Sequence, residues 1–189
     1  VPAPHEPNTQ DRLFARIATI GGMAEVELGR MVEQKGGSDA VKDFGRRMVQ
    51  DHGKANDQLA GLAKQADIPL PGGLDPEHKA MRDQPQAMGD SDFDRAYLHG
   101  QIADHQKTVQ LLEWEINFGQ DAGIKHFASE TLPTVLHHLQ MAQDLMTQIT
   151  GQALQGAAPG TTLASNEPAR RQGAPGSDGQ KGSGTRNTR

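Results

Sequence analysis

The sequence predicts an all-α protein whose main domain is a four-helix bundle. Along four segments of roughly 25–30 residues each, apolar residues recur every three or four positions, which is the period of an amphipathic helix. No run of strand length alternates apolar and polar residues, and no glycine-punctuated hairpin occurs. Four amphipathic helices of this length bury their apolar stripes against one another, as in a bundle.

Composition assigns the bundle to one part of the chain. Of the 189 residues, 34% are hydrophobic and 4% aromatic, and 8 of the 22 glycines fall in residues 151–189. This segment is too poor in apolar residues to form a core, so it is predicted to be a disordered tail. Residues 1–10, which hold three prolines, are predicted to be a flexible arm, and residues 11–150 the bundle.

Charge and cysteine content exclude several classes of function. The net charge is −5, and because the tail carries five basic and two acidic residues, the rest of the chain carries −8. An acidic body with one Trp and one Tyr disfavours a nucleic-acid partner. The absence of cysteine excludes disulfides, cysteine-ligated metals and thiol catalysis. No apolar run reaches the roughly 18 residues of a membrane span.

The predicted helices have recognisable ends. The first runs from Asp11 to the Gly36-Gly37 pair, with a stripe that starts at Leu13 and Ile17. The second begins after Ser38, a good N-cap, and continues to about residue 66. A short helix is predicted over 75–82. The last two cover 91–119, with Ser91 and Asp94 as a capping box, and 121–150, in which Pro133 should kink or restart the helix.

The lengths of the connections select one bundle topology. The first and third connections are about 3–4 residues long, whereas the middle one has about 24. A helix of 27 residues is about 40 Å long, and about 24 extended residues reach about 80 Å. The middle connection can therefore cross the whole bundle. Two hairpins joined by one long crossover form the ferritin-like arrangement.

Three histidines interrupt the apolar stripes of three different helices. His52 lies about 14 residues from the start of its helix and His105 about 13, while His138 lies about 12 residues before the end of a helix that runs the other way. At about 1.5 Å per residue these levels differ by less than roughly 10 Å. The crossover topology therefore predicts that the three imidazoles meet in the core.

Metal binding is the chemistry that such a group favours. Neutral imidazole binds zinc, copper, iron and nickel, and a carboxylate adds negative charge. The candidate ligands are His52, His105 and His138, with Glu25 or Glu27, at a similar level of the first helix, as the fourth. Zinc or copper is the expected ion. A di-iron centre is less expected because no Glu-x-x-His motif is present.

The same residues have plainer interpretations. Each histidine could be a core residue bonded to a carboxylate or a backbone carbonyl. Met48 and Met141 share the histidine faces, where they either fill gaps in the core or provide a soft environment for Cu(I). Asp51 and Asp104 precede two of the histidines but point about 100° away on the helix, toward other helices or solvent.

Several segments together resemble the bacterial family called domain of unknown function 4142. They occur in the expected order within about residues 11–146 and read GMAEVELG from position 22, RMVQDH from 47, FDRAY from 93, DHQK from 104 and TLP from 131, followed by His138. The resemblance implies a ferritin-like helical bundle that is exported from the cell, and it implies no particular reaction.

Two classes of function follow from these observations. The first is an exported, periplasmic or secreted bundle that binds one transition-metal ion, for which the mature-type start at Val1-Pro2 is also typical. An open coordination position would extend this hypothesis to an oxidative enzyme. The alternative is a non-catalytic cell-envelope or extracellular interaction module whose core histidines are structural; the sequence identifies no protein partner for it.

Overall fold

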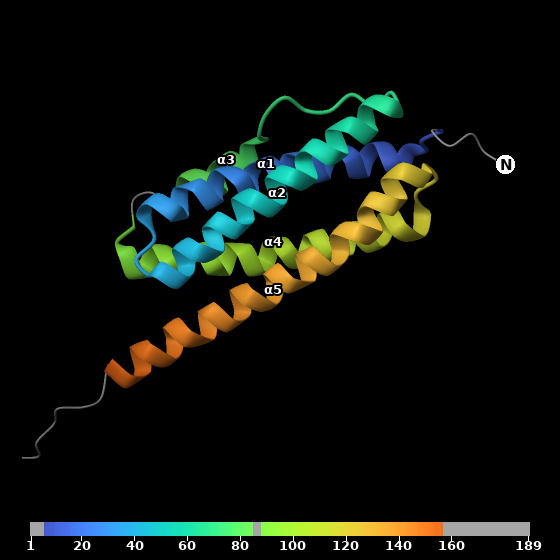
Figure 1. The fold of residues 1–189 in the computed structure, drawn as a ribbon. Coiled ribbons are helices and arrows are strands. Elements are labelled where there is room, and N and C mark those ends of the chain that lie inside the picture. Colours follow the sequence, from blue (N-terminus) through green and yellow to red (C-terminus); the bar gives the residue numbers. More distant parts are fainter. Residues whose placement is uncertain (1–5, 85–87, 157–189) are drawn as a thin grey trace, which may run out of the picture. The chain divides into compact units, whose positions relative to one another are not determined.

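The chain folds into a helical bundle, as predicted. The computed structural model describes residues 6–84 and 88–156, and within these ranges all regular structure is helical (Figure 1). The helices are α1 (Thr9–Lys35), α2 (Asp39–Gln65), α3 (Pro76–Asp83), α4 (Asp90–Phe118) and α5 (Ala122–Gly156). The four long helices form a ferritin-like four-helix bundle, which confirms the predicted fold class.

Some of the predicted helix ends are confirmed and others are wrong. Ser38 caps α2 as predicted, because its hydroxyl accepts from the Val41 N–H. The N-cap of α1 is Asn8, so this helix includes residues 9 and 10 of the predicted arm. The capping box predicted at Ser91 and Asp94 is wrong, since Gly89 is the N-cap of α4 and makes no side-chain bond.

Asp94 instead stabilises the turn between α1 and α2. Its Oδ1 accepts from the Gly37 N–H at 2.8 Å, and its Oδ2 accepts from the Ser38 N–H at 2.9 Å. The start of α4 therefore lies at the α1–α2 turn. At the opposite end, Arg12 of α1 donates to the carbonyl of Asp67, just beyond α2. The segment between α2 and α4, which includes α3, must therefore run the length of the bundle, as the crossover topology requires.

The core consists of two apolar clusters at different levels of the bundle. One, near the start of α1, is built around Phe14, Leu59, Leu112 and Ile124. The other, near the α1–α2 turn, is built around residues such as Val32, Phe44, Met48 and Leu98. On each long helix, the residues between these clusters include a buried or half-buried polar side chain: Glu25 on α1, His52 on α2, His105 on α4 and His138 on α5. This polar layer holds the candidate site.

Three sequence predictions about the helices need correction. Leu13 and Ile17 are exposed, each at 43%, because the buried face of α1 passes through Phe14 instead. Helix α5 passes through Pro133 as one element, so of the kink or restart predicted there, the restart is wrong. It also continues to Gly156, so residues 151–156 of the predicted tail are helical. The rest of that tail, and residues 1–5 of the predicted arm, lie outside the described residues.

Candidate metal centre

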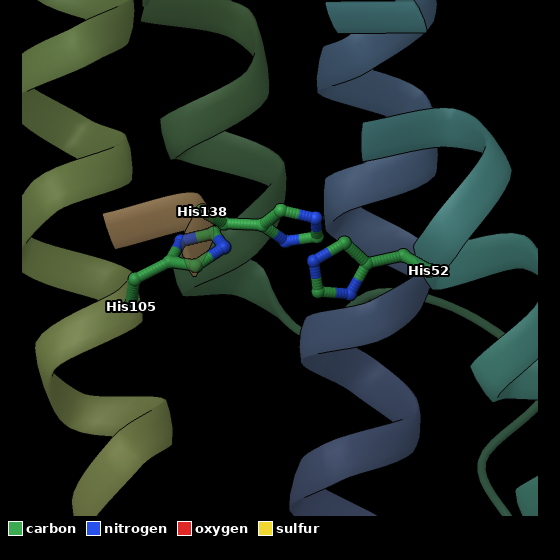
Figure 2. A group of neighbouring side chains, drawn as sticks. All are labelled: His52, His105 and His138. Carbon is green, nitrogen blue, oxygen red and sulfur yellow. The ribbon is translucent and has the colours of Figure 1, made fainter. Parts of the chain in front are cut away.

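The side chains of His52, His105 and His138 meet in the core of the bundle. Figure 2 shows the three rings turned toward one another from three helices. The centroid of the His52 ring lies 5.6 Å from that of His105 and 5.4 Å from that of His138. The centroids of His105 and His138 are 5.6 Å apart. One nitrogen from each ring lies within 4.8 Å of the other two. The structure thus brings together the three histidines whose depths were matched from sequence.

Hydrogen bonds orient two of these rings. His105 donates from Nδ1 to the carbonyl oxygen of Gln101, 2.9 Å away and one turn earlier on α4. His138 donates from Nε2 to Oδ2 of Asp51, on α2, at 2.8 Å. Carbonyl and carboxylate oxygens only accept, so each of these ring nitrogens carries the proton. In the neutral rings the other nitrogen, Nε2 of His105 and Nδ1 of His138, therefore has a free lone pair.

The remaining ring nitrogens have no hydrogen-bond partner among the residues that the structure describes. They are Nε2 of His52, Nε2 of His105 and Nδ1 of His138, and all three atoms are buried. His105 and His138 are each only 1% exposed, and His52 is half-buried. Buried polar atoms in folded proteins are nearly always paired, so three unpaired ring nitrogens in one layer of the core call for a common explanation.

The environment keeps these rings neutral, which is the state in which imidazole can bind a metal. Burial is the main cause that lowers the pKa of all three histidines. Repulsion from His105 and His138 lowers the pKa of His52 further, and repulsion from His138 does so for His105. The pKa of His105 falls to about 4. At neutral pH none of the three carries the proton that would block coordination.

Of the two glutamates predicted as a fourth ligand, only Glu25 reaches this region. Its carboxylate is 2% exposed, and Oε1 lies 3.9 Å from Nδ1 of His105, on the side of the ring that faces Gln101. Glu27 is half-exposed and pairs with Arg82 of α3 at 2.9 Å. Two residues along a helix differ by about 200° in direction, so α1 could place only one of them in the core.

Asp104 joins Glu25 on the same side of His105. Ligand atoms of Glu25, Asp104 and His105 lie within 4.8 Å of one another and form a second group next to the three imidazoles. Burial, with the neighbouring Asp104 as the next cause, raises the pKa of Glu25 well above its usual value. From the sequence, Asp104 was expected to face another helix or solvent, and Gln101 was not identified. The one sequence feature that could have indicated Gln101 is its spacing of four residues from His105.

A cavity of about 360 Å³ extends from this polar layer toward α3. Glu25, His52 and Asp104 contribute to its inner lining, together with apolar side chains such as Leu59 and Phe127. Residues of α3, including the 70% exposed Glu77, also line it. The cavity therefore connects the polar layer with the surface and gives water and small solutes access to it.

The other residues singled out from the sequence lie elsewhere. His99, His126 and His137 are exposed, as their positions off the apolar stripes predicted. Met48 is fully buried in the cluster near the α1–α2 turn, where it fills the core, and Met141 packs against the same cluster.

Fold and site together define the class: an all-α, ferritin-like bundle with a buried layer of histidines and carboxylates. The particular family follows from the sequence, which matches the domain of unknown function DUF4142 over residues 1–145. The chain belongs to this family, as the motifs in the sequence indicated. A comparison with curated proteins gave no match.

Two solved structures share this fold. One is a DUF305 fragment from Deinococcus radiodurans, with a TM-score of 0.68 and 12% identity over 76% of this chain and 99% of that chain. The other is a candidate secreted DUF305 protein from Streptomyces coelicolor, with a TM-score of 0.64 and 13% identity over 75% of this chain and 92% of that one. At these identities the likeness concerns the fold alone. Within the described residues, no helix is both long and apolar enough to span a membrane.

Proposed function

We propose that this protein binds one transition-metal ion, zinc or copper, through His52, His105 and His138. The observation that carries the proposal is the set of three buried, unpaired ring nitrogens contributed by three helices. A metal ion is a partner that accepts all three lone pairs at once. Three imidazoles are a ligand set that suits zinc and copper. A di-iron pair would need about four carboxylates in addition to histidines.

The geometry requires only a small adjustment for such an ion. Nitrogens bound to one tetrahedral ion at about 2.0–2.1 Å lie about 3.3 Å apart, and the three candidate nitrogens lie within 4.8 Å. Binding of the ion would therefore bring the nitrogens closer together by up to about 1.5 Å. The bonds from His105 to Gln101 and from His138 to Asp51 resemble the outer contacts that orient metal-bound histidines.

Three protein ligands leave a fourth position for a solvent molecule or a small ligand. The cavity beside His52 provides access to that position from the surface. Glu25 lies beside Nδ1 of His105, the nitrogen that is bonded to Gln101, and belongs to the neighbouring carboxylate group. It is therefore not required as the fourth ligand. A site with an exchangeable fourth ligand is compatible with transport of the ion and with chemistry on it.

We further propose that the protein is exported, to the periplasm or outside the cell. The structural neighbour from Streptomyces coelicolor, described as a candidate secreted protein, supports this location.

Metal content and calorimetric titration test the proposed site. Protein prepared without a histidine tag and stripped with chelator should bind one equivalent of Zn²⁺ or Cu²⁺. His52→Ala and His138→Ala should each abolish this binding. His126→Ala, which changes an exposed ring, is the matched control and should bind normally. If both core variants bind the ion as the unchanged protein does, the histidines are structural, and the alternative of an interaction module is favoured.

A further inference from the structure

The carboxylates next to the imidazoles form a group that metal binding at the three histidines does not use. Glu25 comes from α1 and Asp104 from α4, and their ligand atoms lie within 4.8 Å of each other and of a nitrogen of His105. Asp104 and His105 are adjacent on α4 and therefore point about 100° apart. This spacing sends His105 toward α2 and α5 and leaves Asp104 beside α1.

Glu25 is buried, and one of its two carboxylate oxygens has no hydrogen-bond partner among the described residues. Only 2% of the residue is exposed, and in the described part of the chain its Oε2 atom has no hydrogen-bond partner. Its other oxygen, Oε1, lies 3.9 Å from Nδ1 of His105, and the proton on that nitrogen is already donated to the carbonyl of Gln101. The nearest charged neighbour is Asp104, which has the same sign. Two carboxyl groups beside each other in a core are unfavourable unless a cation or a shared proton compensates them.

The cavity gives an ion both a route and room for its water ligands. Glu25 and Asp104 line its inner part, and Asp75, the N-cap of α3, and Glu77 on α3 add acidic groups toward the surface. Its volume of about 360 Å³ exceeds that of several water molecules, each of which occupies about 30 Å³. Cations such as Mn²⁺ commonly keep water ligands and combine them with carboxylates.

We propose that Glu25 and Asp104 form a second cation site, bordered by His105, for a divalent ion that prefers oxygen ligands, with Mn²⁺ as the representative. The two carboxylates bind the ion, and water from the cavity completes its coordination. The donor sets differ, three imidazole nitrogens on one side of His105 and two carboxylates on the other, so the two sites select different ions. The chain then holds a softer and a harder cation next to each other.

Binding of Mn²⁺ to zinc-loaded protein tests this second site. Free Mn²⁺ gives an intense electron paramagnetic resonance signal that diminishes on binding, so a titration yields stoichiometry and affinity. We expect one Mn²⁺ per chain in the unchanged protein, and a loss of affinity of at least about tenfold in Glu25→Gln and in Asp104→Asn, equivalent to about 1.4 kcal/mol. Glu27→Gln is the matched control on α1, because Glu27 pairs with Arg82 outside the cavity.

His52→Ala separates this site from the imidazole site. His52 is not part of the carboxylate group, so this variant should lose its zinc and keep its Mn²⁺. Circular dichroism and thermal melts establish that each variant is folded, and Asp104→Asn, at a half-buried position, provides a test independent of the buried Glu25. The proposal is overturned if the unchanged protein binds no Mn²⁺ or if both carboxylate variants bind it as tightly as Glu27→Gln. If the unchanged protein binds Mn²⁺ but no zinc, the imidazole site is contradicted and the carboxylate site still stands.

Discussion

Asp51 on α2 accepts a hydrogen bond from His138 on α5, with 2.8 Å between Oδ2 and Nε2. The two residues are 87 positions apart in the chain. Asp51 precedes His52, so two successive residues of α2 serve the same site in different ways. His52 directs its ring toward the other imidazoles, and Asp51 determines which nitrogen of His138 carries the proton. The free Nδ1 of His138 is a consequence of this contact.

Removing this carboxylate should weaken metal binding without removing a ligand. In Asp51→Ala, His138 loses its fixed tautomer and orientation, and we expect affinity for Zn²⁺ to fall about 10–100-fold. Asp51→Asn keeps an acceptor oxygen and should have a smaller effect. Calorimetric titration measures both. Asp57→Ala, at an exposed position of the same helix, is the control, and equal affinities for Asp51→Ala and Asp57→Ala would refute an orienting role.

Thermal melts should distinguish ligands from structural histidines. An ion that binds only the folded state raises the melting temperature, by an amount that grows with its free concentration. Alanine at His52, His105 or His138 should abolish most of this rise with Zn²⁺ or Cu²⁺. Each variant is melted with metal and with chelator.

Alanine at the exposed His99, His126 or His137 should leave the metal-dependent rise unchanged. Lost packing alone would lower the melting temperature of the core variants by the same amount with metal and with chelator. That result would indicate that the three rings are ordinary core residues.

Glu115 should make the protein less stable as the pH rises toward 8. This side chain is fully buried on α4, and burial, followed by the neighbouring Asp11 carboxyl group, raises its pKa to about 8. Since the usual value is 4.5, the folded state holds this proton more tightly than the unfolded state does. The resulting stability is fully present below about pH 4.5 and is lost as the pH rises through about 8.

Glu115→Gln carries a permanent donor and should remove this dependence. We expect its free energy of unfolding in urea to change less between pH 5 and pH 8 than that of the unchanged protein. The Asp11 carboxylate accepts hydrogen bonds from the backbone N–H groups of Gln120 and Asp121. In Glu115→Gln these bonds should persist at both pH values. Glu113→Gln, at an exposed position of the same helix, should retain the original pH profile. Identical profiles for both variants would show that Glu115 does not hold a proton at neutral pH.

Close contact between α1 and α2 should make Gly45 intolerant of a side chain. A Cβ atom there would overlap Val32 of α1 and lie 2.9 Å from the carbonyl oxygen of Gly29. We expect Gly45→Ala to lower the free energy of unfolding by about 1–3 kcal/mol. Gly61→Ala on the same helix meets no atom within 4 Å and should stabilise the helix by up to about 1 kcal/mol. Urea unfolding measures both, and a stabilised Gly45→Ala would mean that the helices separate easily at this point.

The helices, their order and the depth of the three histidines could all be predicted from the amino-acid sequence. These features depend on local rules: apolar spacing, caps such as Ser38, and the lengths of the connections. Depth along a helix follows from counting residues at a fixed rise, so His52, His105 and His138 could be assigned to one level before their contacts were known. The long crossover then required the four helices to be arranged as observed.

Which other side chains surround the three histidines became clear only from the packing of the helices. Choosing Glu25 over Glu27 requires the rotation of α1 about its axis, and the apolar stripe predicted through Leu13 and Ile17 gave the wrong face at its start. That rotation depends on how closely α1 packs against α2, which glycines such as Gly45 permit. The contact from Asp51 to His138 likewise joins separate helices. Local periodicity specifies where a residue lies along a helix, whereas packing between helices specifies what it faces.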